Sequence, residues 1–252
     1  MGRQGGSRHL KRKPAPKSWS IHRKELVWTV KPKPGPHRIS NCIPLLLIVR
    51  DILGLAKSRK DAKTIISQGE VKVDGDTERE DRFPVGLMDV ISVPALEKAY
   101  RVLPSGKGLM LHPIDAEEAK LKLCRIENKR VIKGGHMQLN LHDGRCVLVQ
   151  VEDPKNPEKN VYRALDVLKI GIPDQEVLEH SNLVEGMPAI IFGGKNMGRH
   201  GSIFAFEERL GQKRRNQLVT IEDEDGIRFQ TIVDLVFPLG HKKPWISLPE
   251  VR

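Results

Sequence analysis

The sequence predicts an α+β, multidomain protein in which small domains follow an extended basic N-terminal arm. Helical spacing of apolar residues is confined to about residues 43–69, and short alternating segments follow it toward the C-terminus. Before residue 42 the chain is basic, proline-rich and without an apolar period. The 252 residues are 38% apolar and only 4% aromatic, which suits several small cores better than one large aromatic core.

The predicted arm, residues 1–41, contains most of the net charge. Residues 1–38 hold eleven basic residues and one acid, Glu25, and so account for +10 of the net charge of +11. Such a segment buries too little apolar surface to fold alone, so we expect it to be disordered without its partner and extended through its prolines. A few apolar residues could stack or dock, namely Trp19, Ile21, Leu26, Val27 and Trp28. Since lysine and arginine neutralise phosphates, the candidate contacts are Arg3, Arg8, Lys11, Arg12, Lys13, Lys17, Arg23, Lys24, Lys31, Lys33 and Arg38.

Residues 42–93 predict two helices and a hairpin. The first helix begins near Pro44 and ends at Gly54, with an apolar face of Leu45, Ile48, Val49 and Ile52. The second begins at the N-cap Ser58 and ends at Gly69, with an apolar face of Ala62, Ile65 and Ile66. Val71 and Val73 alternate with charged residues, and Asp74-Gly75 predicts a hairpin turn. Val90, Ile91 and Val93 predict a closing strand.

Basic residues flank the apolar face of the second helix, where they could contact a phosphate backbone or form an ordinary solvated surface. The candidate RNA contacts are Ser58, Arg59, Lys60, Lys63 and Lys72. The Ser-Arg at the helix start, the glycine at its end and the Val-x-Val-Asp-Gly hairpin resemble the S4-type (αL) RNA-binding domain over roughly residues 43–93. The resemblance implies RNA binding, although RNA-modifying enzymes and one class of synthetases also contain this module.

Residues 94–172 predict a central β-rich domain. Gly106 and Gly108 mark a turn, and Asp115 is expected to cap a short helix that ends near Lys122. Strands are expected at 129–132, 137–141, 146–151 and 161–170, with a polar loop at 152–160.

Residues 173–252 predict a β-barrel around a glycine-rich turn. The turn is not a nucleotide phosphate loop, because Ala189 replaces its first glycine and Asn196 its Ser or Thr. The strand, the Gly-Gly-Lys-x-x-Gly-Arg-x-Gly loop and the next strand resemble a KOW motif in an SH3-like barrel. Exposed N–H groups with basic side chains could bind RNA there. The candidates are Gly194, Lys195, Asn196, Arg199 and His200.

The C-terminal segment adds Lys242, Lys243 and Trp245, which could combine phosphate attraction with base stacking. The alternative is that Trp245 packs against the last barrel.

The sequence also excludes several classes of protein and of functional site. The longest apolar run is 43–49, too short for a membrane span, and residues 1–38 stay too polar for a secretory signal. Five prolines oppose the amphipathic helix of a mitochondrial presequence. Three widely spaced cysteines indicate a reducing compartment. Cys124, Cys146, His136 and His142 lack metal-ligand spacing, so we expect core cysteines and surface histidines, with no metal, cofactor, catalytic residue or small-molecule substrate.

The ordered set of arm, S4-type module and KOW turn resembles the small-subunit ribosomal protein S4e family over nearly all 252 residues. Further matching segments are Gly2-Arg3, Leu10-Lys11-Arg12, Pro36-His37, residues 83–92 and residues 243–249. The resemblance implies a structural protein of the cytoplasmic ribosome, with small-subunit rRNA and neighbouring ribosomal proteins as partners. The chain ends three residues after Pro249, without the longer tail of eukaryotic members, from which we expect an archaeal source.

Two alternatives remain open. A pseudouridine synthase could use the S4-type module, but Gly144-Arg145 and Gly198-Arg199 are not followed by the Leu-Asp that such enzymes need. A KOW-type transcription factor would share only the last module and leave residues 43–93 unexplained.

Overall fold

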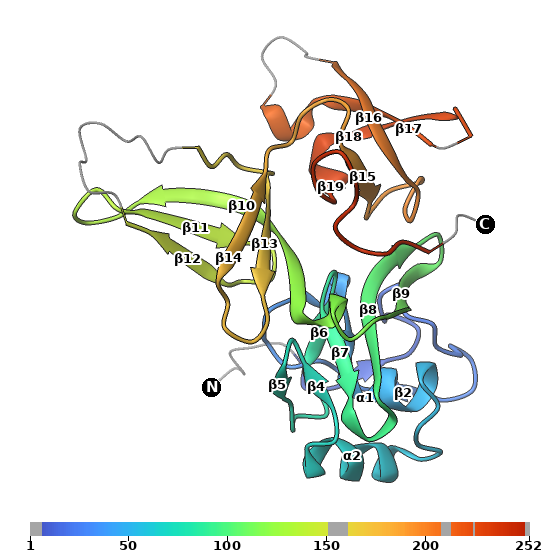
Figure 1. Ribbon diagram of the computed structural model, residues 1–252. Coiled ribbons are helices and arrows are strands. Elements are labelled where there is room, and N and C mark those ends of the chain that lie inside the picture. Colours follow the sequence, from blue (N-terminus) through green and yellow to red (C-terminus); the bar gives the residue numbers. More distant parts are fainter. Residues whose placement is uncertain (1–6, 151–160, 208–212, 224, 250–252) are drawn as a thin grey trace, which may run out of the picture.

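Antiparallel β-sheets dominate the computed structural model, which describes residues 7–150, 161–207, 213–223 and 225–249 (Figure 1). The described residues hold few helices, and none is long and apolar enough to cross a membrane. Arg3 and the whole of the predicted polar loop at 152–160 lie outside the described residues.

The described part of the N-terminal arm, residues 7–41, is ordered and packs on the body, unlike the disordered arm that its composition predicts. Strands β1 (Leu10–Lys11) and β2 (Trp28–Thr29) pair with each other, and Lys11 lies opposite Trp28. The indole N–H of Trp19 donates a hydrogen bond of 2.5 Å to the carbonyl of Cys42. The arm alone has too little apolar surface to bury. It therefore buries what it has against the module that follows it in the chain.

The two predicted helices are present, and the first departs from regular α geometry. It consists of α1 (Leu45–Leu47) and a π-helical turn, Ile48–Ile52. Because a π turn contains an extra residue, Ile52 leaves the predicted apolar face and is 37% exposed. Helix α2 (Arg59–Gln68) begins as predicted at Ser58, whose hydroxyl accepts from the Asp61 N–H while the Asp61 carboxylate accepts from the Ser58 N–H. It ends at Gly69.

The first five-stranded sheet has the order β5-β4-β7-β8-β9. Its strands are β4 (Lys72–Val73), β5 (Asp76–Thr77), β7 (Val90–Val93), β8 (Lys98–Ser105) and β9 (Gly108–Ile114). Beside it, β3 (Cys42–Pro44) pairs with β6 (Pro84–Gly86). The boundary expected after residue 93 falls between β7 and β8, where Val90 pairs with Arg101. The sheet is thus continuous from the helical module into the β8–β9 hairpin.

The second sheet has the order β12-β11-β10-β13-β14 and lies to the left in Figure 1. Its strands are β10 (Leu121–Val131), β11 (Met137–Leu141), β12 (Cys146–Val149), β13 (Val167–Gly171) and β14 (Val177–Ser181). The prediction of a helix from Asp115 to about Lys122 was wrong in its extent. Only a 3₁₀ turn, Glu118–Lys120, forms, and Asp115 does not cap it. Lys122 consequently lies on β10, where it is buried between the half-buried Leu121 and the buried Leu123.

The third sheet, at the top of Figure 1, has the order β18-β17-β16-β15-β19. Its strands are β15 (Pro188–Ile191), β16 (His200–Glu207), β17 (Leu218–Glu222), β18 (Arg228–Ile232) and β19 (Val236–Pro238). Short 3₁₀ turns lie at Ile39–Asn41, Pro94–Leu96, Arg214–Asn216 and Val233–Leu235.

One apolar cluster extends through every part of the molecule. It includes Trp19 of the arm, Ile66 of α2, Leu103 of β8, Leu123 of β10 and Phe237 of β19. Two smaller clusters lie within the second and third sheets. The shared core holds the candidate RNA-binding segments in fixed relative positions.

Candidate nucleic-acid interface

The structure sorts the basic residues of the arm by exposure. Most of them are exposed, namely Arg8, Lys11, Lys13, Lys17, Lys24, Lys33 and Arg38, although Lys33 pairs with Glu80. Arg23 and Lys31 are half-buried, and the Arg23 guanidinium donates to the carbonyls of Ala15 and Pro16. Arg12 is buried, and its guanidinium donates to the carbonyls of His22 and Trp28. Arg12 and Arg23 thus hold the arm together.

Helix α2 presents its predicted contacts to solvent. Ser58, Arg59, Lys60 and Lys63 are exposed, and Lys72 is half-buried on β4. In Figure 1 this helix lies at the opposite end of the molecule from the third sheet. It therefore forms a separate basic surface.

The glycine-rich loop between β15 and β16 also presents basic groups. Gly194, Lys195 and Arg199 are exposed, whereas Asn196 and His200 are half-buried. The Arg199 guanidinium lies 3.9 Å from the centroid of the Phe229 ring on β18. Stacking on an aromatic ring holds a guanidinium in place while its N–H groups stay available for phosphate oxygens.

The β8–β9 hairpin brings the arm and this loop to one place. A Cβ on Gly198 of the loop would lie 2.7 Å from Ser105 Cα, and one on Gly108 would lie 2.2 Å from the Ser18 carbonyl oxygen. The hairpin turn also contains Lys107, an exposed residue that sequence analysis missed because its two flanking glycines indicated only a turn. Lys17, Lys107 and the loop residues thus lie on adjoining segments.

Gly198→Ala is expected to destabilise the protein by about 2–4 kcal/mol, because Gly198 has φ +89° and its new Cβ would meet backbone atoms that cannot move aside. Gly186→Ala is the matched control, since Gly186 has φ +79° with nothing within 4 Å of its Cβ position. Urea denaturation of both variants measures the difference. Equal losses would contradict the role of close packing in seating the loop.

The candidate RNA contacts of the C-terminal segment also differ in exposure. Lys242 and Lys243 are exposed. Trp245 is half-buried, packs against the main core and has the His241 ring edge-on at 5.4 Å. This placement favours the packing alternative for Trp245 over base stacking.

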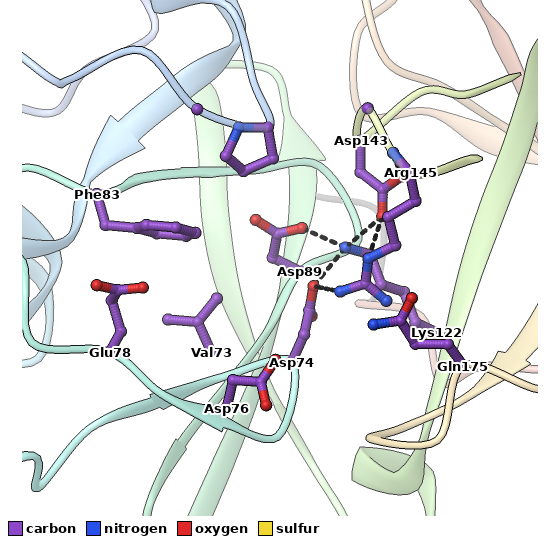
Figure 2. A pocket seen from close by; sticks show the side chains of 13 residues that line it. Val73, Asp74, Asp76, Glu78, Phe83, Asp89, Lys122, Asp143, Arg145 and Gln175 are labelled. Atoms are coloured by element: carbon purple, nitrogen blue, oxygen red, sulfur yellow. Dashed lines mark hydrogen bonds and ion pairs between the residues drawn. The ribbon is translucent and has the colours of Figure 1, made fainter.

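A buried ionic cluster lies at the junction of the arm and the first two sheets (Figure 2). It was not predicted from the sequence. Lys122 Nζ lies 2.6 Å from an oxygen of Asp74, 2.6 Å from one of Asp89 and 3.0 Å from one of Asp143. Arg145 also pairs with Asp74, at 2.8 Å, and with Asp143. His37 Nε2 lies 3.0 Å from Asp89, and its ring fills the space beside Gly86. All three hydrogens of the ammonium therefore have carboxylate partners.

The electrostatics follow from this geometry. Burial opposes ionisation of Asp89 and Asp143, but Lys122 outweighs it and lowers both pKa values, that of Asp143 to about 2. Burial also opposes the charged ammonium, yet the carboxylates raise the pKa of Lys122. For Asp74, burial together with the neighbouring Asp89 raises the pKa. The charges of the cluster therefore neutralise one another, and the cluster links the segments that contribute them.

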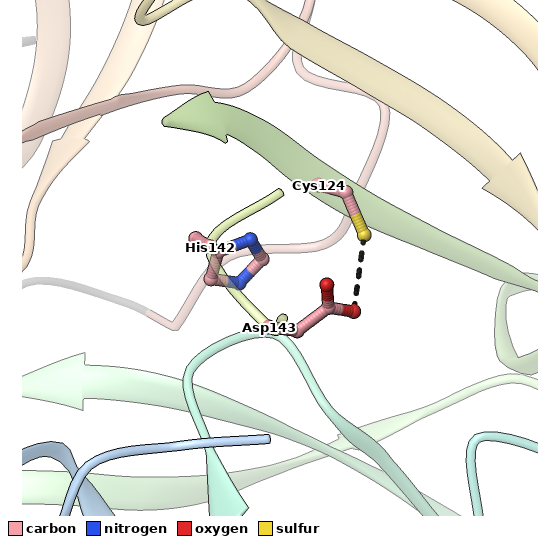
Figure 3. Close-up of side chains that lie close together, drawn as sticks. All are labelled: Cys124, His142 and Asp143. Carbon is pink, nitrogen blue, oxygen red and sulfur yellow. Dashed lines mark hydrogen bonds between the residues drawn. The ribbon is translucent and has the colours of Figure 1, made fainter. Parts of the chain in front are cut away.

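Cys124, His142 and Asp143 lie close enough for a metal, with ligand atoms within 4.8 Å of one another (Figure 3). The His142 nitrogens are already used, however. Nδ1 accepts from the Arg125 N–H at 3.2 Å, so Nε2 bears the proton and donates to the Leu87 carbonyl at 3.1 Å. Asp143 is paired with Lys122. Internal bonds account for the cluster, and His142 is a partly buried structural residue, which corrects its assignment to the surface.

Comparison with known proteins finds relatives along nearly the whole chain. A model of the ribosomal family S4e matches residues 96–177, the RS4NT (NUC023) domain matches 4–40 and the S4 domain matches 45–91. The small ribosomal subunit protein eS4 of Staphylothermus marinus is 53% identical, and that of Desulfurococcus amylolyticus 52%, each covering 99% of both chains.

A solved structure has the same fold. The crystal structure of the 30S ribosomal protein S4e from Thermoplasma acidophilum matches with a TM-score of 0.65 and 32% identity, covering 80% of this chain and 96% of that one. The S4-type module expected at 43–93 is confirmed by the domain match at 45–91. With half of its residues identical to full-length relatives, this chain belongs to the ribosomal protein S4e family.

Proposed function

We propose that this chain is a structural, non-catalytic constituent of the small ribosomal subunit that binds and stabilises small-subunit rRNA. The full-length similarity to relatives named small ribosomal subunit protein eS4 is the observation that supports it most. The S4 domain is an RNA-binding module, and its exposed basic helix suits that role. The partners are rRNA and neighbouring ribosomal proteins, and the protein acts on cytoplasmic ribosomes.

The third sheet would be an SH3-like barrel with a KOW motif. Supporting features are the antiparallel succession from β15 to β18, the glycine-rich loop between β15 and β16, and the 3₁₀ turn that leads into β19 at the side of β15. Residues 173–252 would form this part, 94–172 the central part, 42–93 the S4-type module and 1–41 the arm.

Besides the exposed basic residues of the arm, two separate surfaces would contact RNA. One is α2, with Arg59, Lys60 and Lys63. The other, which we call the hairpin surface, comprises Lys17, Lys107, Lys195 and Arg199 around the β8–β9 turn. Phosphate contacts on rigid segments fix position and orientation, which is the task of a structural RNA-binding protein.

The arm is tested by replacing Arg8, Lys13, Lys17 and Lys24 with glutamine. Each lost phosphate contact should reduce the slope of log affinity against log salt for purified small-subunit rRNA by about 0.7–0.9. All four residues are exposed, so the folded state should be retained. Deleting residues 1–38 is a poorer test, because it also removes Trp19 from the core and His37 from the ionic cluster.

The matched control replaces four exposed basic residues outside the proposed surfaces, Lys98, Lys133, Arg163 and Lys213. Its salt dependence should equal that of the wild type. An arm variant with an unchanged slope would remove the arm from the interface, and a wild-type protein without affinity for this rRNA would overturn the proposed function.

A further inference from the structure

The three tryptophans occupy different environments. Trp19 is 3% exposed and belongs to the core, and Trp245 is half-buried beneath His241. Trp28 is 56% exposed in the described chain, beside Leu26 at 62% and Val27 at 61%. A large aromatic surface left in water on a folded protein indicates a binding site.

The backbone of Trp28 is fixed although its side chain is exposed. Trp28 pairs with Lys11 across β1 and β2, and Arg12 N–H donates to the Val27 carbonyl at 2.9 Å. The buried Arg12 guanidinium donates to the Trp28 carbonyl at 3.3 Å. Buried Arg12 thus positions the indole, which is presented by a short β-ribbon anchored to the body.

The surroundings of the indole are cationic. Lys11 Nζ lies 5.8 Å from the centroid of the Trp28 ring, and the exposed His9 ring is centred 5.6 Å away at a tilt of 58°. Between residues 7 and 30 the arm has seven basic residues and one acid, Glu25, which faces Arg12 at 4.0 Å and His22 at 3.7 Å. An exposed aromatic ring beside a lysine matches a nucleotide, whose base stacks while its phosphate meets the cation.

We propose that Trp28 is a stacking site for an unpaired RNA base, with Lys11 binding the adjoining phosphate. The inference rests on the proposed function and adds an assigned base contact to it. An apolar protein segment is the competing occupant of the patch formed by Leu26, Val27 and Trp28. The charge beside the indole favours RNA, because a ring within reach of an ammonium suits a phosphate-linked base better than an apolar helix.

Two substitutions separate stacking from apolar docking. Trp28→Phe retains a smaller aromatic ring, whereas Trp28→Leu retains only an apolar side chain. With purified small-subunit rRNA, we expect Trp28→Leu to lose about tenfold in affinity, near the lower end of the effect of one base–aromatic stack, and Trp28→Phe to lose less than threefold. The salt slope should stay constant in both, whereas Lys11→Ala should reduce it by about 0.7–0.9.

Phe204→Leu is the matched control. Phe204 is 47% exposed, but the Arg228 guanidinium already lies 3.7 Å from its ring centroid, so affinity should not change. Binding of rRNA should also quench indole fluorescence, and Trp28→Phe should lose most of this quenching because Trp19 is buried and Trp245 is half-buried.

The outcomes are distinct. Wild-type affinity in Trp28→Leu, with the wild type binding rRNA, would overturn the stacking site and leave the proposed function standing. Wild-type rRNA affinity combined with poor incorporation into reconstituted subunits would assign the patch to a protein partner and also overturn it. Loss of rRNA binding by the wild type itself would overturn both.

Discussion

Replacing Lys122 with methionine is expected to lower the free energy of unfolding by about 3–5 kcal/mol. The substitution keeps the volume and the strand but removes the ammonium that all three buried carboxylates share. Asp89 is 1% exposed and Asp143 2% exposed, so the lost partner leaves poorly solvated charges behind. Urea denaturation at pH 7 measures the loss.

Lys169→Met is the matched control. Lys169 lies on β13, next to β10 in the same sheet, but its partner Glu179 is exposed and 2.8 Å away, which predicts a loss below about 1 kcal/mol. Adding Asp143→Asn to Lys122→Met should recover part of the stability, because it removes one uncompensated charge. A loss in Lys122→Met no larger than that of the control would show that the cluster does not hold the fold together.

Lowering the pH from 6.5 to 4 is expected to reduce the free energy of unfolding by roughly 3 kcal/mol through His142 alone. Burial lowers the pKa of this imidazole from 6.5 to about 4, and Lys122 and His37 act in the same direction. The unfolded chain therefore takes up a proton below pH 6.5 that the folded protein refuses until about pH 4. The contribution is fully present above pH 6.5 and is lost as the pH falls through this interval.

Asp143 acts in a different interval and so does not obscure the result. Its pKa, depressed to about 2, adds stability that persists above its ordinary value of 3.8 and disappears only below it. His142→Asn, which offers an acceptor to the Arg125 N–H but does not titrate, should make the stability profile between pH 6.5 and 4 less steep. A profile as steep as that of the wild type would assign the pH dependence to other groups.

Local elements followed well from local residues. Ser58 and Gly69 delimit α2 as predicted, because a cap acts within one turn of the chain. Asp74-Gly75 was predicted as a hairpin turn, and it occurs between the paired strands β4 and β5. The family and the S4-type module were likewise recognised from short ordered motifs.

Contacts between distant segments could not be predicted in the same way. Asp74 looked like a turn residue only, since nothing local shows that Lys122 reaches it together with Asp143. The wrong helix prediction near Lys122 also hid its role. On the observed strand this residue lies between Leu121 and Leu123 and is buried. In the same way, the arm appeared free because the residues that bury Trp19 come from the body.

The anchored arm changes how association with RNA should proceed. A disordered cationic tail loses conformational entropy when it binds, whereas here residues 7–41 are already held through Trp19 and the His37–Asp89 pair. The entropy cost of ordering the arm is met when the protein folds. Binding to RNA is therefore not weakened by that cost. Electrostatic attraction then acts on a surface of fixed shape, which favours rapid capture of a matching RNA and weak retention on a mismatched one.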